Sequence, residues 1–383
     1  MDREMKRMYD SPRMRVVQGI KSLLQKRKIG KGERLPTEFK LAEMYGVSRG
    51  TVRTALAELE RDGFLKSVRN TCRISSYEDD DSALLSKTCI MLSKLTDDPS
   101  IYTRSGKMWA VEAGAIHACR TCGLNTMFFN EKNFDDGSYR KVLEMRPYGI
   151  LVSHGISDDP YYAETLKAVA EQGIQMVVNG GTEAVLPFDR VIADQEKGCY
   201  LLAKHLAGAG ARRILRLWAA SESNYWLNDR NRGFEKAIRE SKLPLLPAAY
   251  IIGLEKRLED STRENFDRRT RQYAGYLAEY LADRNRPDAI IVTSDSDFFP
   301  VAAACRLFRL TPGKDVLIAG YDNFYRECNE GIWEKSVPFA TIDKHNYETG
   351  TKMFEMLYSR REGSFPKKPQ LAKIEPELIM AKA

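Results

Sequence analysis

The stretch from Gly32 to Leu65 constrains the fold of this chain more than any other part of its sequence. It reads GERLPTEFKLAEMYGVSRGTVRTALAELERDGFL. Gly46 can take the left-handed conformation that ends a helix, and Ser48 follows where an N-cap hydroxyl belongs. Beyond Ser48, apolar residues recur at intervals of three and four, at Val52, Ala55, Leu56 and Leu59. The pattern predicts two short helices joined by a glycine turn, with one side of the second helix facing a core.

The polar residues of this second helix gather at its N-terminal end. They are Ser48, Arg49, Gly50, Thr51 and Arg53. A helix with polar and cationic side chains at its N terminus is suited to enter the major groove of DNA. Thr37 is placed to cap the preceding helix, and Lys40 lies in its first turn. We therefore expect a helix-turn-helix in which all seven of these residues lie at the DNA.

Segments on both sides of this motif complete a small domain. Upstream, apolar residues at helical spacing predict a third amphipathic helix, and these are Val16, Val17, Ile20, Leu23 and Leu24. Gly63 is placed to end the second helix of the motif. Residues 64–74 then alternate and turn around Asn70, a residue type that tolerates positive φ. The sequence predicts a winged helix, with Arg69 in the wing as a further candidate for DNA contact.

The charge of the chain is unevenly distributed. All 383 residues together carry a formal net charge of +7. Residues 1–75 contain 18 Lys and Arg against 9 Asp and Glu, whereas the rest contains 42 against 44. The basic excess lies entirely in the first segment, which favours a polyanionic partner bound there through phosphate neutralisation and counterion release.

The run LPTEFKLAEMYGVSRGTVRTALAELERDGFL resembles the GntR-type winged helix-turn-helix of bacterial regulators, over roughly residues 8–75. This resemblance implies DNA contact for Ser48, Arg49, Thr51 and Arg53, with the two arginines meeting bases or phosphates. The chain departs from the family pattern at Phe39, where an arginine is usual, and at residues 69–72, which read RNTC instead of Gly-x-Gly-Thr.

Beyond the winged helix, the sequence divides into a linker and a large α/β segment. Residues 75–87 read SSYEDDDSALLSK, which is acidic, polar and without periodicity. Afterwards, apolar runs such as GILVS, QMVVN and AIIVTS alternate with helical patterns such as EKGCYLLAKHLAGAG. The alternation predicts parallel sheets with helices on both faces. We expect a DNA-binding domain at 1–75, a linker at 76–87 and two Rossmann-like lobes at 88–383.

Several kinds of site are not expected. No G-x-G-x-x-G or P-loop follows an apolar run, so we predict no nucleotide or other cofactor. Cys119 and Cys122 form a C-x-x-C, but without further ligands they are expected to be core thiols, and no metal site is predicted. Asp295 and Asp297 can be read as an acid–base pair, yet no nucleophile accompanies them, so no enzyme is expected. The absence of a signal peptide and of a long apolar span favours a cytoplasmic protein that does not contact membranes.

The large segment contains sequence stretches that resemble a second known family. The phrases DRVIADQEKGCYLLAKHLAGAGARRILRLW, DRNRGFEKAIRE, PDAIIVTSDSDFFPVAAACRLF, DVLIAGYDN and FATIDKHNYETG resemble the effector domain of the lactose/galactose repressor family. That domain shares the type I periplasmic-binding-protein fold. The resemblance covers about residue 88 to the C terminus and implies a two-lobed domain that binds a small effector and dimerises. It also implies effector contact for Arg230, which precedes Gly233 in an R-x-x-G-F pattern.

Candidate effector residues follow the predicted strands, because ligands of open α/β sheets bind beyond the carboxyl ends of strands. The polar residues in such positions are Asn179, Ser294, Asp295 and Asp322. Arg230 and Asp322 suit the paired hydroxyls of a sugar, and Tyr102 and Trp226 are candidates to stack on its apolar face. Three alternatives stay open: Arg232 in place of Arg230, His154 as a further contact, and the cluster at 268–271 as either a solvated face or a selector of acidic sugars.

The sequence thus predicts a ligand-controlled transcription factor. We expect a homodimer that sets two recognition helices on a pseudo-palindromic DNA operator. A repressor released by a small carbohydrate fits the family resemblance. The alternatives are an activator, or an effector of another kind such as a sugar acid, a phosphosugar or a nucleobase.

Overall fold

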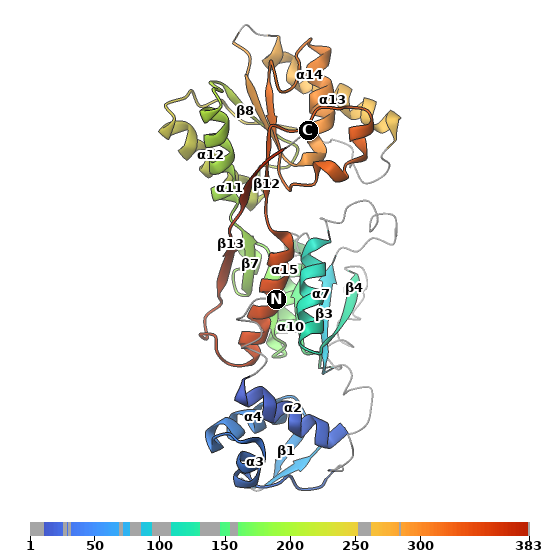
Figure 1. Cartoon of the computed structure of the whole chain (residues 1–383), viewed down its shortest axis with the longest axis vertical. Helices are drawn as coiled ribbons and strands as arrows, with labels where there is room; N and C mark the ends of the chain where they lie inside the picture. The colour runs from blue at the N-terminus through green and yellow to red at the C-terminus, as the bar shows by residue number, and fades with distance from the viewer. Residues whose placement is uncertain are drawn as a thin grey trace.

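The computed structural model consists of three parts stacked along one long axis (Figure 1). It describes residues 11–25, 29, 32–68, 72–76, 86–93, 109–130, 146–153, 160–251, 262–282 and 285–381. We call residues 11–76 the head. The N lobe is built on one six-stranded sheet, and the C lobe on a four-stranded sheet with an adjoining two-stranded ladder. Most of the predicted linker, residues 77–85, lies outside the described residues.

The head is a winged helix. Its elements are α2 (Pro12–Gln25), α3 (Glu38–Tyr45), α4 (Arg49–Arg61), β1 (Leu65–Val68) and β2 (Cys72–Ser75). The two strands pair antiparallel. Gly46 has φ 62° and ends α3, and the Ser48 hydroxyl caps α4 by accepting a hydrogen bond from the backbone N–H of Thr51. The predicted turn chemistry is therefore confirmed.

The head has its own apolar core. The predicted stripe of α4 is buried throughout, at Val52, Ala55, Leu56 and Leu59. It meets Val16, Val17, Ile20 and Leu24 of α2, with Phe64 and Leu65 beneath. Because these three helices and the wing share one core, the orientation of α4 within the head is fixed.

The N lobe has a parallel sheet in the order β13-β7-β6-β5-β3-β4. Helices α7 and α15 cover one face of it, and α10 covers the other. Its elements are β3 (Thr88–Ser93), α7 (Ala110–Thr121), β4 (Asn125–Asn130), β5 (Gly149–Val152), α10 (Pro160–Glu171), β6 (Met176–Asn179), η1 (Glu183–Val185), β7 (Asp189–Ala193), α15 (Asn346–Arg361) and β13 (Leu371–Ile374).

The C lobe repeats this architecture with the strand order β11-β10-β8-β9. Helices α11 and α12 cover one face, and α13 and α14 the other. Its elements are α11 (Gln195–Gly208), β8 (Ile214–Trp218), α12 (Tyr225–Glu240), β9 (Ala249–Tyr250), α13 (Arg263–Leu281), β10 (Ala289–Val292), α14 (Asp295–Leu307), β11 (Leu317–Ala319), η3 (Tyr325–Glu327), η4 (Asn329–Ile332), β12 (Ala340–Asp343) and β14 (Glu377–Met380).

The chain passes between the lobes at three places, which together form a hinge. These are the junctions from β7 to α11, from β12 to α15 and from β13 to β14. The lobes also touch directly, since a Cβ on Gly181, after β6, would lie 2.4 Å from the Tyr225 ring at the start of α12. The carboxyl ends of strands from both sheets therefore lie near the boundary between the lobes.

Candidate DNA interface and effector site

The N-terminal turn of α4 is ordered and open to solvent. The Ser48 hydroxyl accepts from the Thr51 backbone N–H at 3.1 Å and lies 2.8 Å from the Thr51 hydroxyl. Arg49, Gly50 and Arg53 are all exposed. An exposed helix N terminus with preset side chains matches the geometry of a helix that reads the major groove. The five residues expected at this end are thus brought together on one surface.

Arg53 is held by a carboxylate of the neighbouring helix. Its Nε donates to Glu38 Oε2 at 2.8 Å, although 63% of the Arg53 side chain is exposed. Glu38 also pairs with Arg73 of the wing at 3.1 Å. Burial alone would raise the pKa of Glu38, but hydrogen bonds and charges from both arginines hold this pKa below its ordinary value. Glu38 therefore links α3, α4 and the wing.

The remaining head candidates have different environments. The Thr37 hydroxyl accepts from the Lys40 backbone N–H at 3.3 Å, so it acts as the N-cap of α3. The Lys40 side chain is exposed, and so is Phe39, at 68%. Arg69 lies outside the described residues.

Each lobe has a topological switch point, where neighbouring strands connect in opposite directions and ligands of open sheets bind. In the C lobe it lies between β8 and β10. There the Ala219 N–H donates to the Thr293 hydroxyl at 2.6 Å. In the N lobe it lies beside β3, whose neighbours are β4 and β5.

Arg230 lies at the switch point of the C lobe and is 3% exposed. It donates to Gln195 Oε1 at 2.9 Å and to the Thr293 carbonyl at 2.7 Å. Its guanidinium carbon lies 4.7 Å from the Trp226 ring centroid and 3.5 Å from that of Tyr321. Burial raises the pKa of Tyr321, so this ring stays neutral. Two rings and two hydrogen bonds thus hold the guanidinium in one orientation.

Asp322 and Ser294 stand at the ends of the adjacent strands. Asp322 has φ 89°, in the left-handed region that non-glycine residues rarely adopt, and such strain is often found at functional sites. Its Oδ1 lies 2.6 Å from Lys344 Nζ, on the segment that leads back to the N lobe. The Ser294 hydroxyl lies 2.5 Å from that of Ser296. Asp322 therefore connects the switch-point edge of the C lobe to the segment that leads back to the N lobe.

Asp295 is turned inward, unlike its neighbour Ser294. Its side chain is fully buried and accepts from the Thr341 hydroxyl and from the backbone N–H groups of Phe324 and Tyr325. Burial raises the pKa of Asp295 to about 7. This carboxyl joins three segments of the C lobe, an arrangement that the position of Asp295 after a strand did not reveal.

The arginines whose roles the sequence left open differ in their burial. Arg232 is 59% exposed and pairs with Glu196 and Asp229, so Arg230 is the arginine at the switch point. Arg268 and Arg271 are exposed, but Arg269 is 4% exposed and pairs with Asp297 at 2.9 Å. The interpretation as a solvated face is therefore wrong for Arg269, because its position on α13 faces the C-lobe core.

The N lobe contributes a group that sequence reasoning missed. Glu112 on α7 is 7% exposed and accepts from the Ser93 hydroxyl, at the end of β3, at 2.9 Å. Burial raises the pKa of Glu112, although hydrogen bonds from Ser93 and Ser153 oppose the shift. Asn179 ends β6 and is 9% exposed. The serines follow apolar strands, as the other candidates do, and this signal could have drawn attention to the environment of Glu112.

The remaining expectations concern residues that the structure does not describe, and the metal and membrane alternatives. Tyr102 and His154 lie outside the described residues. Cys119 is buried in the N-lobe core, where its neighbour Cys89 has a pKa raised by their hydrogen bond and by burial. Within the described ranges, no group of His, Cys, Asp and Glu is arranged to hold a metal ion. No helix of these ranges has both the length and the apolarity to cross a bilayer.

Comparison with known proteins agrees with this geometry. Residues 12–71 match the model of bacterial regulatory proteins of the gntR family, and residues 203–380 match a periplasmic binding protein-like domain. The chain is a DNA-binding transcriptional regulator in which a GntR-type head is joined to two lobes that resemble a periplasmic binding protein-like domain. We call these two lobes together the sensor domain.

A relative along nearly the whole chain is the arabinose metabolism transcriptional repressor of Geobacillus stearothermophilus. The two are 24% identical over 357 residues, which cover 91% of this chain and 90% of the relative. A LacI-family regulatory protein from Chloroflexus aggregans has a similar fold, with a TM-score of 0.60, 22% identity, and coverage of 78% of this chain and 98% of that one. The structure of the transcriptional regulator CelR–cellobiose complex has a TM-score of 0.59 and 16% sequence identity. The match covers 90% of this chain and 99% of that one.

Proposed function

We propose that this protein is a repressor that binds a pseudo-palindromic operator as a homodimer and releases it when a small carbohydrate binds between the lobes. The observation that carries the proposal is Arg230, a guanidinium fixed between two rings at a switch point, in the same chain as an exposed recognition helix. One site senses a small molecule, and the other contacts DNA.

On the DNA side, the proposal assigns base or phosphate contact to the exposed end of α4. Arg49 and Arg53 supply cations, and the capped first turn supplies backbone N–H groups. The basic excess of residues 1–75 strengthens binding to any duplex by releasing counterions. Two heads in a dimer would set two such helices one or more DNA turns apart.

On the effector side, the proposal assigns Arg230, Asp322 and Trp226 from the C lobe, with Asn179 and Glu112 opposite them. An arginine and a carboxylate match the donors and acceptors of neighbouring sugar hydroxyls. An aromatic ring offers a flat apolar face to a sugar ring. A carbohydrate is further supported by the names of two similar proteins, which concern arabinose metabolism and a cellobiose complex.

Control of DNA binding follows from differential affinity. A ligand that contacts both lobes binds best when they are closed, so it shifts the population towards the closed state. If that state sets the two heads at a spacing that does not fit the operator, affinity for DNA falls by the same coupling free energy. Typical couplings change affinity by about 5- to 150-fold.

Three measurements with the whole 383-residue chain test this proposal. Selection from a random duplex library should enrich a two-fold symmetric sequence, and light scattering should give a dimer. A thermal-shift panel of pentoses, hexoses, disaccharides, sugar acids and sugar phosphates should raise the melting temperature for one class. Enrichment of no sequence would refute the DNA assignment. A shift by sugar acids or phosphates alone would replace the neutral sugar with an anion at Arg230.

A further inference from the structure

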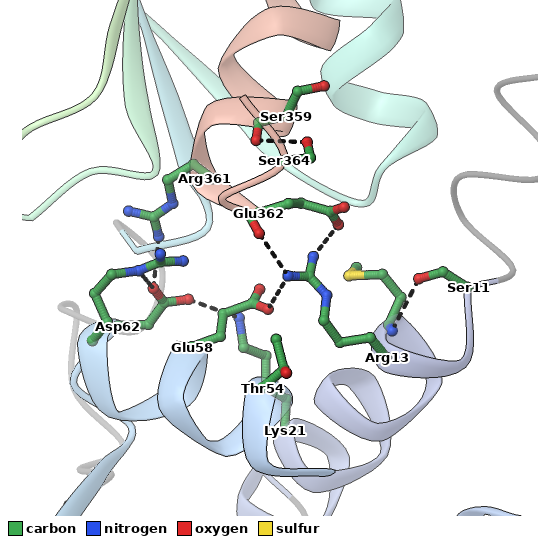
Figure 2. A network of polar contacts seen from close by, with 12 residues as sticks. Ser11, Arg13, Lys21, Thr54, Glu58, Asp62, Ser359, Arg361, Glu362 and Ser364 are labelled. Carbon is green, nitrogen blue, oxygen red and sulfur yellow. Dashed lines mark hydrogen bonds and ion pairs between the residues drawn. The ribbon is translucent and has the colours of Figure 1, made fainter. Parts of the chain in front are cut away.

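The head is docked on the N lobe through a network of charged side chains (Figure 2). Helices α2 and α4 approach the C-terminal end of α15, and the six charged residues between them are Arg13, Lys21, Glu58, Asp62, Arg361 and Glu362. We call this set the docking cluster. It joins residues nearly 300 positions apart, since Asp62 and Arg361 are separated by 299.

Asp62 forms one half of the docking cluster. It caps the C terminus of recognition helix α4, and its side chain is 4% exposed. Arg361, at the end of α15, donates to Asp62 Oδ1 at 2.8 Å, and Lys21 of α2 lies 3.7 Å from Oδ2. The recognition helix therefore ends on a cation supplied by the N lobe.

Arg13 forms the other half. Its guanidinium pairs with Glu58 of α4 at 3.5 Å and with the carboxylate of Glu362. It also donates to the Glu362 carbonyl at 3.3 Å. Beside it, Met14 packs against the apolar core of the N lobe. One arginine of the head thus bridges the recognition helix and the end of α15.

Burial distinguishes this contact from an ordinary pair of surface charges. All six side chains are between 4% and 21% exposed. Burial raises the pKa of Glu58 and lowers that of Lys21. Separating the head from the lobe would leave several of these charges without the partners they have here, and removing one partner of a buried pair is costly.

Helix α15 connects the docking cluster to the hinge. It begins after His345, next to the Lys344 that pairs with Asp322 at the switch-point edge of the C lobe. Its 16 residues span about 24 Å. Along its length it packs closely on α7, because a Cβ on Gly350 would lie 1.7 Å from the Val111 carbonyl. A tightly packed helix moves as a rigid body.

We propose that the head is held on the N lobe of its own chain by the docking cluster, and that α15 carries hinge movement to recognition helix α4. The second part rests on the proposed function, because it needs an effector that moves the lobes. The Arg361–Asp62 and Arg13–Glu362 contacts then set the orientation of each recognition helix relative to its lobe.

Chemical cross-linking tests the docking by itself. In Arg13→Lys, a zero-length carbodiimide should join the new amine to the Glu362 carboxylate, and peptide mass spectrometry should find this link in monomeric chains. Arg15→Lys, an exposed site on the same helix, is the matched control and should give no link to residues 359–364. Absence of the link between position 13 and Glu362 in the Arg13→Lys variant, or its presence only between two chains, overturns docking within the chain.

Charge reversal tests whether α15 carries hinge movement to α4 through the docking cluster. Arg361→Glu faces Asp62 with a like charge, and Arg361→Gln removes the cation without repulsion. With the selected duplex and the stabilising sugar, both should keep duplex affinity within about threefold of the unmodified protein. The effector-induced change in affinity, about tenfold or more in the unmodified protein, should fall below about threefold. Arg15→Glu should retain the full change.

If both Arg361 variants are folded by circular dichroism and keep the full effector-induced change in duplex affinity, the proposal that α15 carries hinge movement to α4 is overturned. Failure of the unmodified chain to select any duplex instead refutes the proposed function. The cross-linking result does not depend on DNA or effector, so the two failures are distinguishable.

Discussion

The head and the sensor domain place their key arginines in opposite environments. Arg53 is 63% exposed and pairs with Glu38, which also pairs with Arg73 of the wing. Arg230 is 3% exposed, between two aromatic rings and two hydrogen-bond acceptors. The carboxylates differ in the same way, since the pKa of Glu38 is lowered and that of buried Asp295 is raised.

Under the proposed function, this difference reflects what each region binds. A polyanion is attracted over a distance, so exposed cations that can reorient serve it well. A small neutral ligand supplies few contacts, so its site must be organised before it arrives. The surface of the head and the interior of the sensor should therefore respond differently to the same kinds of substitution.

The largest expected effect concerns Asp295. Its folded-state pKa of about 7 exceeds the ordinary 3.8, so the native state binds the proton more tightly than the unfolded state. The stabilisation is fully present below 3.8 and is lost as pH rises through about 7. It amounts to on the order of 4 kcal/mol.

Asp295→Asn should remove this pH dependence of the free energy of unfolding. Urea unfolding monitored by tryptophan fluorescence at several pH values measures it. The amide can still accept from the two backbone N–H groups and can donate to Thr341. The matched control is Glu264→Gln, because Glu264 is an exposed carboxylate of the same lobe. If the free energy of unfolding of Asp295→Asn still fell between pH 4 and 7 as in the unmodified protein, the raised pKa would be contradicted.

Removal of Arg230 should come next. Arg230→Ala leaves a cavity between two rings and takes the donor from the Thr293 carbonyl, so the free energy of unfolding should fall by about 3 kcal/mol. Arg232→Ala, at an exposed arginine of the same helix, should change it by less than about 1 kcal/mol. Equal losses in both variants would mean that burial does not distinguish the two arginines.

Removal of Arg53 should affect DNA binding and not folding. Arg53→Ala should weaken the selected duplex by about 1–3 kcal/mol and, if the contact is to phosphate, reduce the salt slope by about one. Its melting temperature and its response to sugar should stay unchanged. Filter binding at several salt concentrations measures both quantities, with Arg15→Ala as the control. Undiminished duplex affinity would remove Arg53 from the interface.

The smallest effect should come from Glu38→Gln. Partly exposed ion pairs contribute little, so the head should lose less than about 1 kcal/mol. Because the pKa of Glu38 is lowered, its contribution is present above its ordinary value and is lost as pH falls. Hydrogen exchange of α3 and α4 in the whole chain should show this acid-side loss, opposite in sign to that of Asp295. A loss on the alkaline side would contradict the pairing.

Much of the head could be predicted from the sequence because its signals are local. Gly46, Ser48 and the apolar stripe of α4 specify a turn, a cap and a buried face within fewer than twenty residues. The exposed end of α4 follows directly, since residues opposite a buried stripe face solvent. The ion pairs of Glu38 with Arg53 and Arg73 could not be predicted, because they join three separate elements.

The sensor was predicted at the level of its strands and less well at the level of its side chains. The strand-end rule selected Asp322, Ser294 and Asn179, which stay predictions, but it also included Asp295, which faces inward. It passed over Glu112, because that residue is on a helix and reaches the strand ends only through the fold. Direction and burial depend on packing between elements, which a one-dimensional pattern does not contain.

The sequence by itself determined the elements of this protein: the winged head, the alternating strands and helices, and the candidate residues at strand ends. Periodicity, caps and charge act over a few neighbouring residues, so they can be read along the chain. Only the tertiary structure decided that Arg230 lies between Trp226 and Tyr321, and that Asp62 of the head meets Arg361 of the N lobe. Those contacts join residues far apart in sequence, and packing of whole elements brings them together.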